Sequence, residues 1–138
     1  MVFATEKIVD FAKKVHFEDI PLDVVVKTKY LILDSLGIAV ASTSLPVSSQ
    51  VRGMVFKILG MGKGDLGNKL NQGCSVIGGK NILPVTYASM INGSLIHSLD
   101  FDDTHTKSVI HNCAPLVPTA LCGSELFQSN GRDFLKSI

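Results

Sequence analysis

Residues 97–111 hold the densest group of side chains that could do acid–base chemistry. His97 is followed by carboxylates at positions 100, 102 and 103, by the hydroxyl of Thr104, and by the imidazoles of His105 and His111. A carboxylate can anchor such a site, a hydroxyl can hydrogen-bond a substrate oxygen, and an imidazole can carry a proton near neutral pH. This combination predicts a proton-transfer site.

The spacing within this group indicates which side chains could act together. If the helix that contains His97 continues through Asp100, then Asp100 and Thr104 are one turn apart on the same face. His111 lies seven residues beyond Thr104, which is two further turns or the reach of a loop. Asp103 and Lys107 are also four residues apart, and this spacing favours an exposed ion pair.

Two other interpretations of the same residues stay open on spacing alone. The acidic run could simply solvate the end of a helix, with the histidines as ordinary surface groups. Alternatively, the carboxylates with His105 and His111 could hold Mg²⁺ or Mn²⁺. The Asp-Phe-Asp-Asp order matches no established metal-binding loop, so the sequence favours no metal site.

Further candidates carry less information. Cys113, two residues after His111, could be a nucleophile, although a small buried thiol is the commoner role. His97 falls on an apolar helix, which favours a packed or supporting imidazole. The run Gly62-Lys63-Gly64-Asp65 contains no complete phosphate-binding motif and follows no strand, so nucleotide binding is rejected.

Composition excludes several classes of function. Hydrophobic residues make up 46% of the 138 residues and charged residues 18%, which is typical of a globular chain with apolar surfaces that something else covers. The net charge of +1 and the lack of a basic stripe argue against nucleic-acid binding. The most apolar stretch, 22–41, carries four charged side chains, too many for a membrane helix. Three widely spaced cysteines (Cys74, Cys113, Cys122) favour a reducing setting, cytoplasmic or, in a eukaryotic host, mitochondrial.

The positioning elements are expected to be helices. Apolar periodicity and prolines predict helices over about 5–14, 21–41, 46–59, 84–99 and 119–127, and another begins near position 132 after a possible cap at 129–131. The broad apolar surface of 22–41 suggests burial on more than one side. Seven glycines between 60 and 79 predict a loop region with at most one short strand near 74–77. The expected fold class is all-α.

A longer motif carries a family resemblance. The segment 83–105 reads LPVTYASMINGSLIHSLDFDDTH, and it strongly resembles the MmgE/PrpD family, which includes 2-methylcitrate dehydratase and cis-aconitate decarboxylase. Supporting matches in the same order are Leu33-Asp34-Ser35-Leu36-Gly37, Ser75-Val76-Ile77-Gly78, Val117-Pro118-Thr119 and Gly131-Arg132-Asp133-Phe134-Leu135. The resemblance covers essentially the whole chain.

The resemblance implies a lyase acting on a small di- or tricarboxylic acid, usually a homodimer, that needs no metal or other cofactor. The family's active-site Asp, Thr and His fall on Asp100, Thr104 and His111. The residues beside them are expected to bind substrate: His97, Asp103, His105 and Cys113. The family usually has proline after the histidine, where this chain has Asn112.

The same resemblance implies that residues 1–138 are an incomplete helical domain, with a second α+β domain absent. Three carboxylates would repel a polycarboxylate substrate, since each unscreened contact at 4 Å costs about 4 kcal/mol at an effective dielectric of about 20. The compensating basic residues are expected outside these 138 residues, so the chain alone is expected to be inactive. The alternative is a non-catalytic, truncated helical protein or dimerisation module.

Overall fold

The computed structural model describes residues 3–62 and 73–138, and these residues are mostly helical. The glycine-rich segment is therefore described only at its two ends, and most of the rejected phosphate-loop motif lies outside the described residues. The helices are α1 (Ala4–Lys14), a 3₁₀ turn (Phe17–Asp19), α2 (Leu22–Ser42), α3 (Pro46–Ile58), α4 (Val85–His97), α5 (Cys113–Phe127) and α6 (Gly131–Lys136). The expected helical fold class is confirmed.

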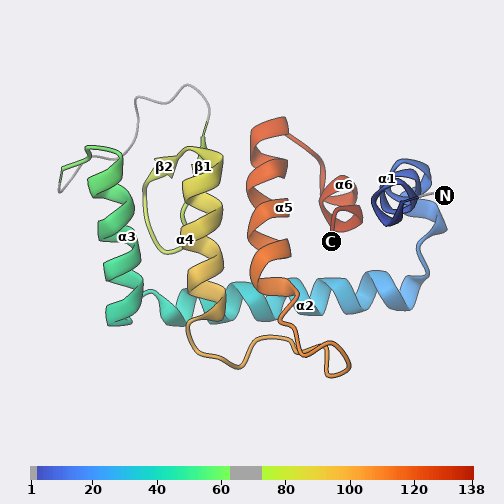
Figure 1. Ribbon diagram of the computed structural model, residues 1–138, viewed down its shortest axis with the longest axis horizontal. Helices are drawn as coiled ribbons and strands as arrows, with labels where there is room; N and C mark the ends of the chain where they lie inside the picture. Colours follow the sequence, from blue (N-terminus) through green and yellow to red (C-terminus); the bar gives the residue numbers. More distant parts are fainter. Residues whose placement is uncertain (1–2, 63–72) are drawn as a thin grey trace.

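Helix α2 forms the base of the fold, and α3, α4 and α5 extend from it on one side. Figure 1 shows α2 as one long helix, with α3, α4 and α5 side by side and nearly perpendicular to it. Helices α4 and α5 pack closely against each other and both rest on α2. The loop between α4 and α5, residues 98–112, lies at their α2 end (Figure 1). The predicted chemical residues therefore belong to this loop and to the two helix ends that it joins.

The sheet content differs slightly from the expectation of at most one strand. Two strands of two residues each, β1 (Cys74–Ser75) and β2 (Ile82–Leu83), pair antiparallel with Cys74 opposite Leu83. The glycines between 60 and 79 indicated a loop, but one of them, Gly78, belongs to the turn that connects the two strands. Its φ of +71° is a conformation that favours glycine. The expectation of a single strand was wrong for this reason.

The core lies where α2, α3, α4 and α5 meet the small sheet. Its central side chains are fully buried, and α4 contributes the largest share because one of its faces is continuously apolar. These core residues are Ala39, Val55, Cys74, Val76, Leu83, Ala88, Ile91, Leu95, Ile96, Cys113, Val117 and Cys122. The packing fixes α4 and α5 relative to each other.

Helix α5 begins earlier than the prolines suggested. It starts at Cys113 and contains both Pro115 and Pro118, whereas the sequence predicted a start at Thr119. Pro115 falls in the first turn, where a missing N–H costs nothing. Pro118 cannot donate to the carbonyl of Ala114, and this carbonyl lies against Gly93 of α4, 3.0 Å from where a β-carbon would stand. The glycine lets the two helices approach closely.

The outer face of α2 is less covered than expected. Its inward face buries Val25, Ser35, Ile38 and Ala39, but Tyr30 and Leu33 remain about two-thirds exposed. Among the described residues this second face of α2 is exposed, and its predicted burial stays a prediction. No helix among the described residues is both long and apolar enough to span a membrane by itself, although α2 and α3, bent by 87°, would pass that test as a pair.

Candidate active site

Two imidazoles share one buried carboxylate at the α2 end of α4 and α5. The side chain of Asp102 is 1% exposed. The Nδ1 atom of His97 lies 3.2 Å from both oxygens of Asp102, and the Nδ1 atom of His111 lies 3.3 Å from its Oδ1. The two rings are 5.0 Å apart, centroid to centroid, in an edge-to-face arrangement. Among the described residues, this is the only cluster in which two histidine side chains contact one carboxylate.

The end of α4 places His97 in this cluster. Helix α4 stops at His97, and the hydroxyl of Ser98 bonds back to the carbonyl of Ser94. Asp100 then takes a left-handed conformation, φ +54°, which reverses the chain direction and folds Asp102 back under His97. The helix does not continue through Asp100, which was the condition for Asp100 and Thr104 to lie on one helix face. Asp100 and Thr104 do not share a helix face.

The loop places His111 through hydrogen bonds at both of its ends. A backbone bridge joins His105 and Ile110, with the His105 N–H donating to the Ile110 carbonyl at 2.9 Å. The carboxylate of Asp103 accepts the backbone N–H of Cys113 at 2.8 Å, at the first residue of α5. A negative charge at a helix N-terminus is favourable. Asp103 therefore ties the loop to α5, rather than forming the expected ion pair with Lys107.

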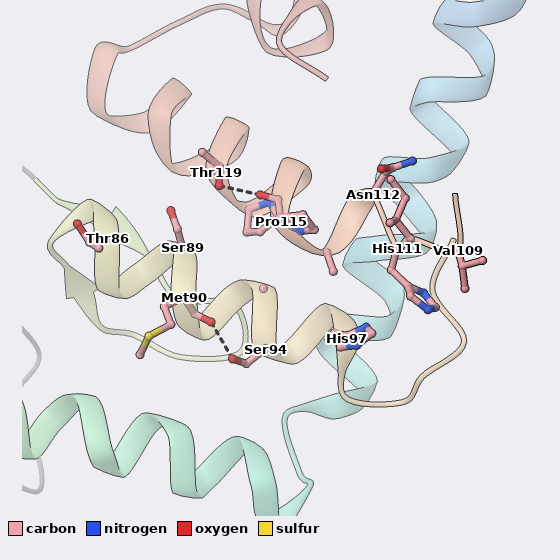
Figure 2. A pocket seen from close by; sticks show the side chains of 14 residues that line it. Thr86, Ser89, Met90, Ser94, His97, Val109, His111, Asn112, Pro115 and Thr119 are labelled. Atoms are coloured by element: carbon pink, nitrogen blue, oxygen red, sulfur yellow. Dashed lines mark hydrogen bonds between the residues drawn. The ribbon is translucent and has the colours of Figure 1, made fainter. Parts of the chain in front are cut away.

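The two histidines lie at one end of a groove between α4 and α5 (Figure 2). The groove has a volume of about 1020 Å³, enough for a small organic acid. Apart from the histidines its walls are largely apolar or hydroxyl-bearing, and no lysine or arginine of the described residues lines it. The α4 side contributes Thr86, Ser89, Met90, Gly93 and Ser94; the loop and α5 contribute Val109, Ile110, Asn112, Ala114, Pro115, Pro118 and Thr119.

The predicted site residues thus separate into two groups. His97 and His111 line the groove. Asp100 and Thr104 do not; both are exposed, and the Thr104 hydroxyl faces the Asp102 carbonyl at 3.4 Å. His105 is also exposed and away from the groove, with its Nδ1 2.6 Å from the Ser108 hydroxyl. The catalytic roles of Asp100, Thr104 and His111, and the substrate-binding role of His105, stay predictions.

Cys113 is buried beneath the site rather than beside the groove. Burial raises the pKa of its thiol to about 12, and the neighbouring Asp103 carboxylate adds to the shift. A thiol held neutral in this way is a poor nucleophile. A buried, protonated thiol is the commoner of the two interpretations, and both the backbone N–H and the thiol of Cys113 interact with the Asp103 carboxylate.

Asp102 is the residue that the sequence analysis missed. It lies five residues after His97, a spacing that no helix or strand brings into contact, so only the left-handed turn at Asp100 could reveal the pairing. The signal present in the sequence was three carboxylates in four positions. Burial distinguishes them, because Asp102 alone is buried while Asp100 is exposed and Asp103 half-buried.

Within residues 3–62 and 73–138, two groups of side chains have ligand atoms close enough to hold a metal ion. In His97, Asp102 and His111 the ligand atoms lie within 4.8 Å of one another, and the same holds for Cys74, Cys122 and Glu125. In the second group burial and the nearby Cys122 together raise the pKa of Cys74 to about 11. This environment disfavours the thiolate that a metal needs. That no metal is needed stays an expectation from the resemblance.

The structure is mostly helical, with an imidazole–carboxylate cluster at one end of a groove between two helices. Comparison with known proteins identifies the family to which this chain belongs. The profile of the MmgE/PrpD N-terminal domain matches residues 6–138. The chain therefore belongs to the MmgE/PrpD family. No solved structure matches the chain significantly.

Relatives with significant similarity carry the names cis-aconitate decarboxylase or cis-aconitate decarboxylase-like protein. The Aspergillus terreus enzyme is 29% identical over 129 residues, which are 93% of this chain and 24% of that protein. The Mus musculus enzyme is 35% identical over 100 residues, 72% of this chain and 18% of that protein. A cis-aconitate decarboxylase-like protein of Aspergillus oryzae is 27% identical over 127 residues, 92% of this chain and 24% of that protein. The chain thus spans about a quarter or less of the length of these relatives.

Proposed function

We propose that this chain is the helical part of a lyase that acts on a small di- or tricarboxylic acid. The observation that carries the proposal is the imidazole pair of His97 and His111 on the buried carboxylate of Asp102, at the end of a groove of suitable size. Family membership and the names of the relatives support a reaction of the cis-aconitate decarboxylase type. The alternative, a 2-methylcitrate dehydration, comes from the family resemblance of the sequence. A reducing compartment, cytoplasmic or mitochondrial, fits three free cysteines.

The chemistry needs a proton carrier near the substrate in either reaction. A dehydration removes a proton beside a carboxylate and protonates the departing hydroxyl, whereas a decarboxylation delivers a proton to the carbanion left by CO₂. His111 suits both roles because an imidazole can give or take a proton near neutral pH. Since none of the described residues that line the groove is a lysine or arginine, we further propose that cations beyond the described residues neutralise the substrate carboxylates.

Thermal unfolding of the purified chain with a tricarboxylate tests this proposal. Millimolar cis-aconitate or citrate should raise the midpoint of unfolding, and at a ligand concentration of 100 Kd the stabilisation is about 2.7 kcal/mol. His111→Gln should abolish the rise. His16→Gln is the matched control, because that exposed imidazole does not line the groove and has no predicted role in substrate binding. The proposal fails if His111→Gln responds to the acids as the wild type does, or if neither acid stabilises the chain together with the part of the protein that supplies these cations. Release of CO₂ from cis-aconitate by a catalytically competent form would separate decarboxylation from dehydration.

A second candidate function is a helical dimerisation module without catalysis. Large apolar side chains are exposed along α1 and α2, including Phe11, Tyr30 and Leu33, each at least 64% exposed. Exposed apolar surface of this kind commonly marks a protein interface, and the family resemblance implies a homodimer. Sedimentation of the wild-type chain and of a Tyr30→Glu, Leu33→Glu variant would test this: a dimer that the variant loses supports it, and a monomeric wild type refutes it.

A further inference from the structure

The carboxylate of Asp102 faces a specific nitrogen of each histidine ring. An ionised carboxylate accepts hydrogen bonds and donates none. Because His97 Nδ1 lies 3.2 Å from both of its oxygens, that nitrogen must carry the proton of the neutral ring. The other ring nitrogen, Nε2, then has a free lone pair. The contact therefore selects one tautomer of His97.

His111 is attached to the same carboxylate in a different way. Its Nδ1 atom is buried and lies 3.3 Å from Asp102 Oδ1, which is an ion-pair distance, but no acceptor reaches it with the alignment of a good hydrogen bond. A buried polar nitrogen without a partner costs about 1–3 kcal/mol. Asp102 Oδ1 is the acceptor that could remove this cost, since a small rotation of the His111 ring would align its Nδ1–H with this oxygen. The contact favours the same tautomer in His111.

We propose that Asp102 is a positioning residue that holds both histidines with the proton on Nδ1. Two Nε2 atoms, rather than one, are then available to exchange protons with a substrate in the groove. Both rings line the groove, and in Figure 2 they lie at the same end of it, one from the end of α4 and one from the loop before α5. The imidazole of His97 then becomes a second proton carrier beside His111. The tautomers stand on geometry alone; only the catalytic use of the pair rests on the proposed function.

A pair of imidazoles balances the protons of a dehydration. One neutral Nε2 takes the proton from the carbon beside the carboxylate, the carbon–oxygen bond breaks with its electron pair on oxygen, and the other ring, starting as imidazolium, gives its Nε2 proton to form water. One ring gains a proton and the other loses one, so the charge of the pair is unchanged. In a decarboxylation one imidazolium would protonate the carbanion as CO₂ leaves, and solvent would return the proton.

Nitrogen NMR of the ¹⁵N-labelled chain tests the inference, because a protonated and a bare ring nitrogen have well-separated shifts. At a pH where the rings are neutral, His97 and His111 should both carry hydrogen on Nδ1. His105 is an internal reference with the opposite expectation, since the Ser108 backbone N–H donates to its Nδ1 at 3.3 Å and leaves the proton on Nε2. Wild-type His97 or His111 with the proton on Nε2 would overturn the proposal without any variant.

Two matched variants then assign the effect to Asp102. Asp102→Asn should shift His97 and His111 away from the Nδ1–H form, whereas Asp100→Asn, which removes an exposed carboxylate from the same loop, should leave both rings unchanged. Unchanged tautomers in Asp102→Asn would also overturn the proposal, and the wild-type spectrum decides the matter if that variant does not fold. A chain that shows the expected tautomers but binds no tricarboxylate would contradict only the proposed function.

Discussion

The side-chain amide of Asn92 lies against β1 as an additional strand would, donating from Nδ2 to the Ser75 carbonyl at 2.9 Å. Its Oδ1 atom accepts the backbone N–H of Ile77, also at 2.9 Å. Asn92 is fully buried in α4, so one side chain satisfies two backbone groups that no strand partner reaches. This contact joins the small sheet to the helix that carries His97.

Replacing Asn92 with Asp should destabilise the fold strongly while preserving its shape. The Ser75 carbonyl loses its donor and a charge is buried, for a combined loss of about 2–3 kcal/mol in the free energy of unfolding. Urea denaturation of both proteins measures it. Asn112→Asp is the control, since the Asn112 side chain makes no capping hydrogen bond and its replacement should change stability by less than about 0.5 kcal/mol. Equal midpoints for wild type and Asn92→Asp would contradict the assigned contact.

The buried thiols predict a loss of stability at alkaline pH. Burial raises the pKa of Cys113 to about 12 and that of Cys74 to about 11, from an ordinary value of 9.0. The unfolded chain therefore loses these protons from about pH 9 while the native chain retains them. Stability is full below pH 9 and falls as the pH rises toward 11–12, by about 1 kcal/mol per pH unit for each thiol.

Denaturant titrations between pH 8 and pH 10.5 measure this slope. Cys113→Ala should be less stable at pH 8 but should show a shallower decline with pH, because one of the two shifted groups is gone. A variant that declines as steeply as the wild type would show that ionisation of Cys113 does not drive the alkaline loss.

Local patterns predicted the helices well because their signals are local. Pro21, Pro46 and Pro84 each stand at or just before the start of a helix, and Asn130 accepts the backbone N–H groups of Arg132 and Asp133 as the cap expected near the start of α6. The predicted start of α5 at Thr119 is too late, because a proline such as Pro118 usually marks the start of a helix. In the structure Pro118 lies inside α5, where packing against Gly93 accommodates it.

The site was only partly predictable for a similar reason. The residue types near His97 and His111 indicated proton transfer, but the partner of both rings depends on the left-handed turn at Asp100 and on the burial of one carboxylate among three. Neither property follows from spacing, since Asp100, Asp102 and Asp103 are the same residue type. Only the packed chain distinguishes them.

Asp103 should contribute to stability through α5. Its carboxylate accepts the Cys113 N–H at 2.8 Å, at the end of the helix where a negative charge is favourable. Asp103→Asn weakens this bond and removes the charge, so we expect a loss of about 1 kcal/mol. Thermal unfolding at neutral pH measures it, with Asp100→Asn as the control that removes an equal charge from an exposed position. The role is refuted if the two variants lose the same stability.

Val109 is a site of backbone strain next to the proposed proton carrier. Its φ is +53°, a conformation that a β-branched residue rarely adopts, and its side chain is 79% exposed, so little packing offsets the strain. The loop imposes this conformation because the Val109 N–H donates to the His105 carbonyl at 2.8 Å while Ile110 completes the bridge to His105. Val109→Asn should therefore stabilise the chain by about 1 kcal/mol, since asparagine tolerates the left-handed region. Calorimetry would show a rise in Tm of about 3 °C.

The matched substitution Val24→Asn, at another exposed valine but inside α2, should lower Tm instead. A Val109→Asn chain that also melts earlier would mean that the loop is not strained at this residue.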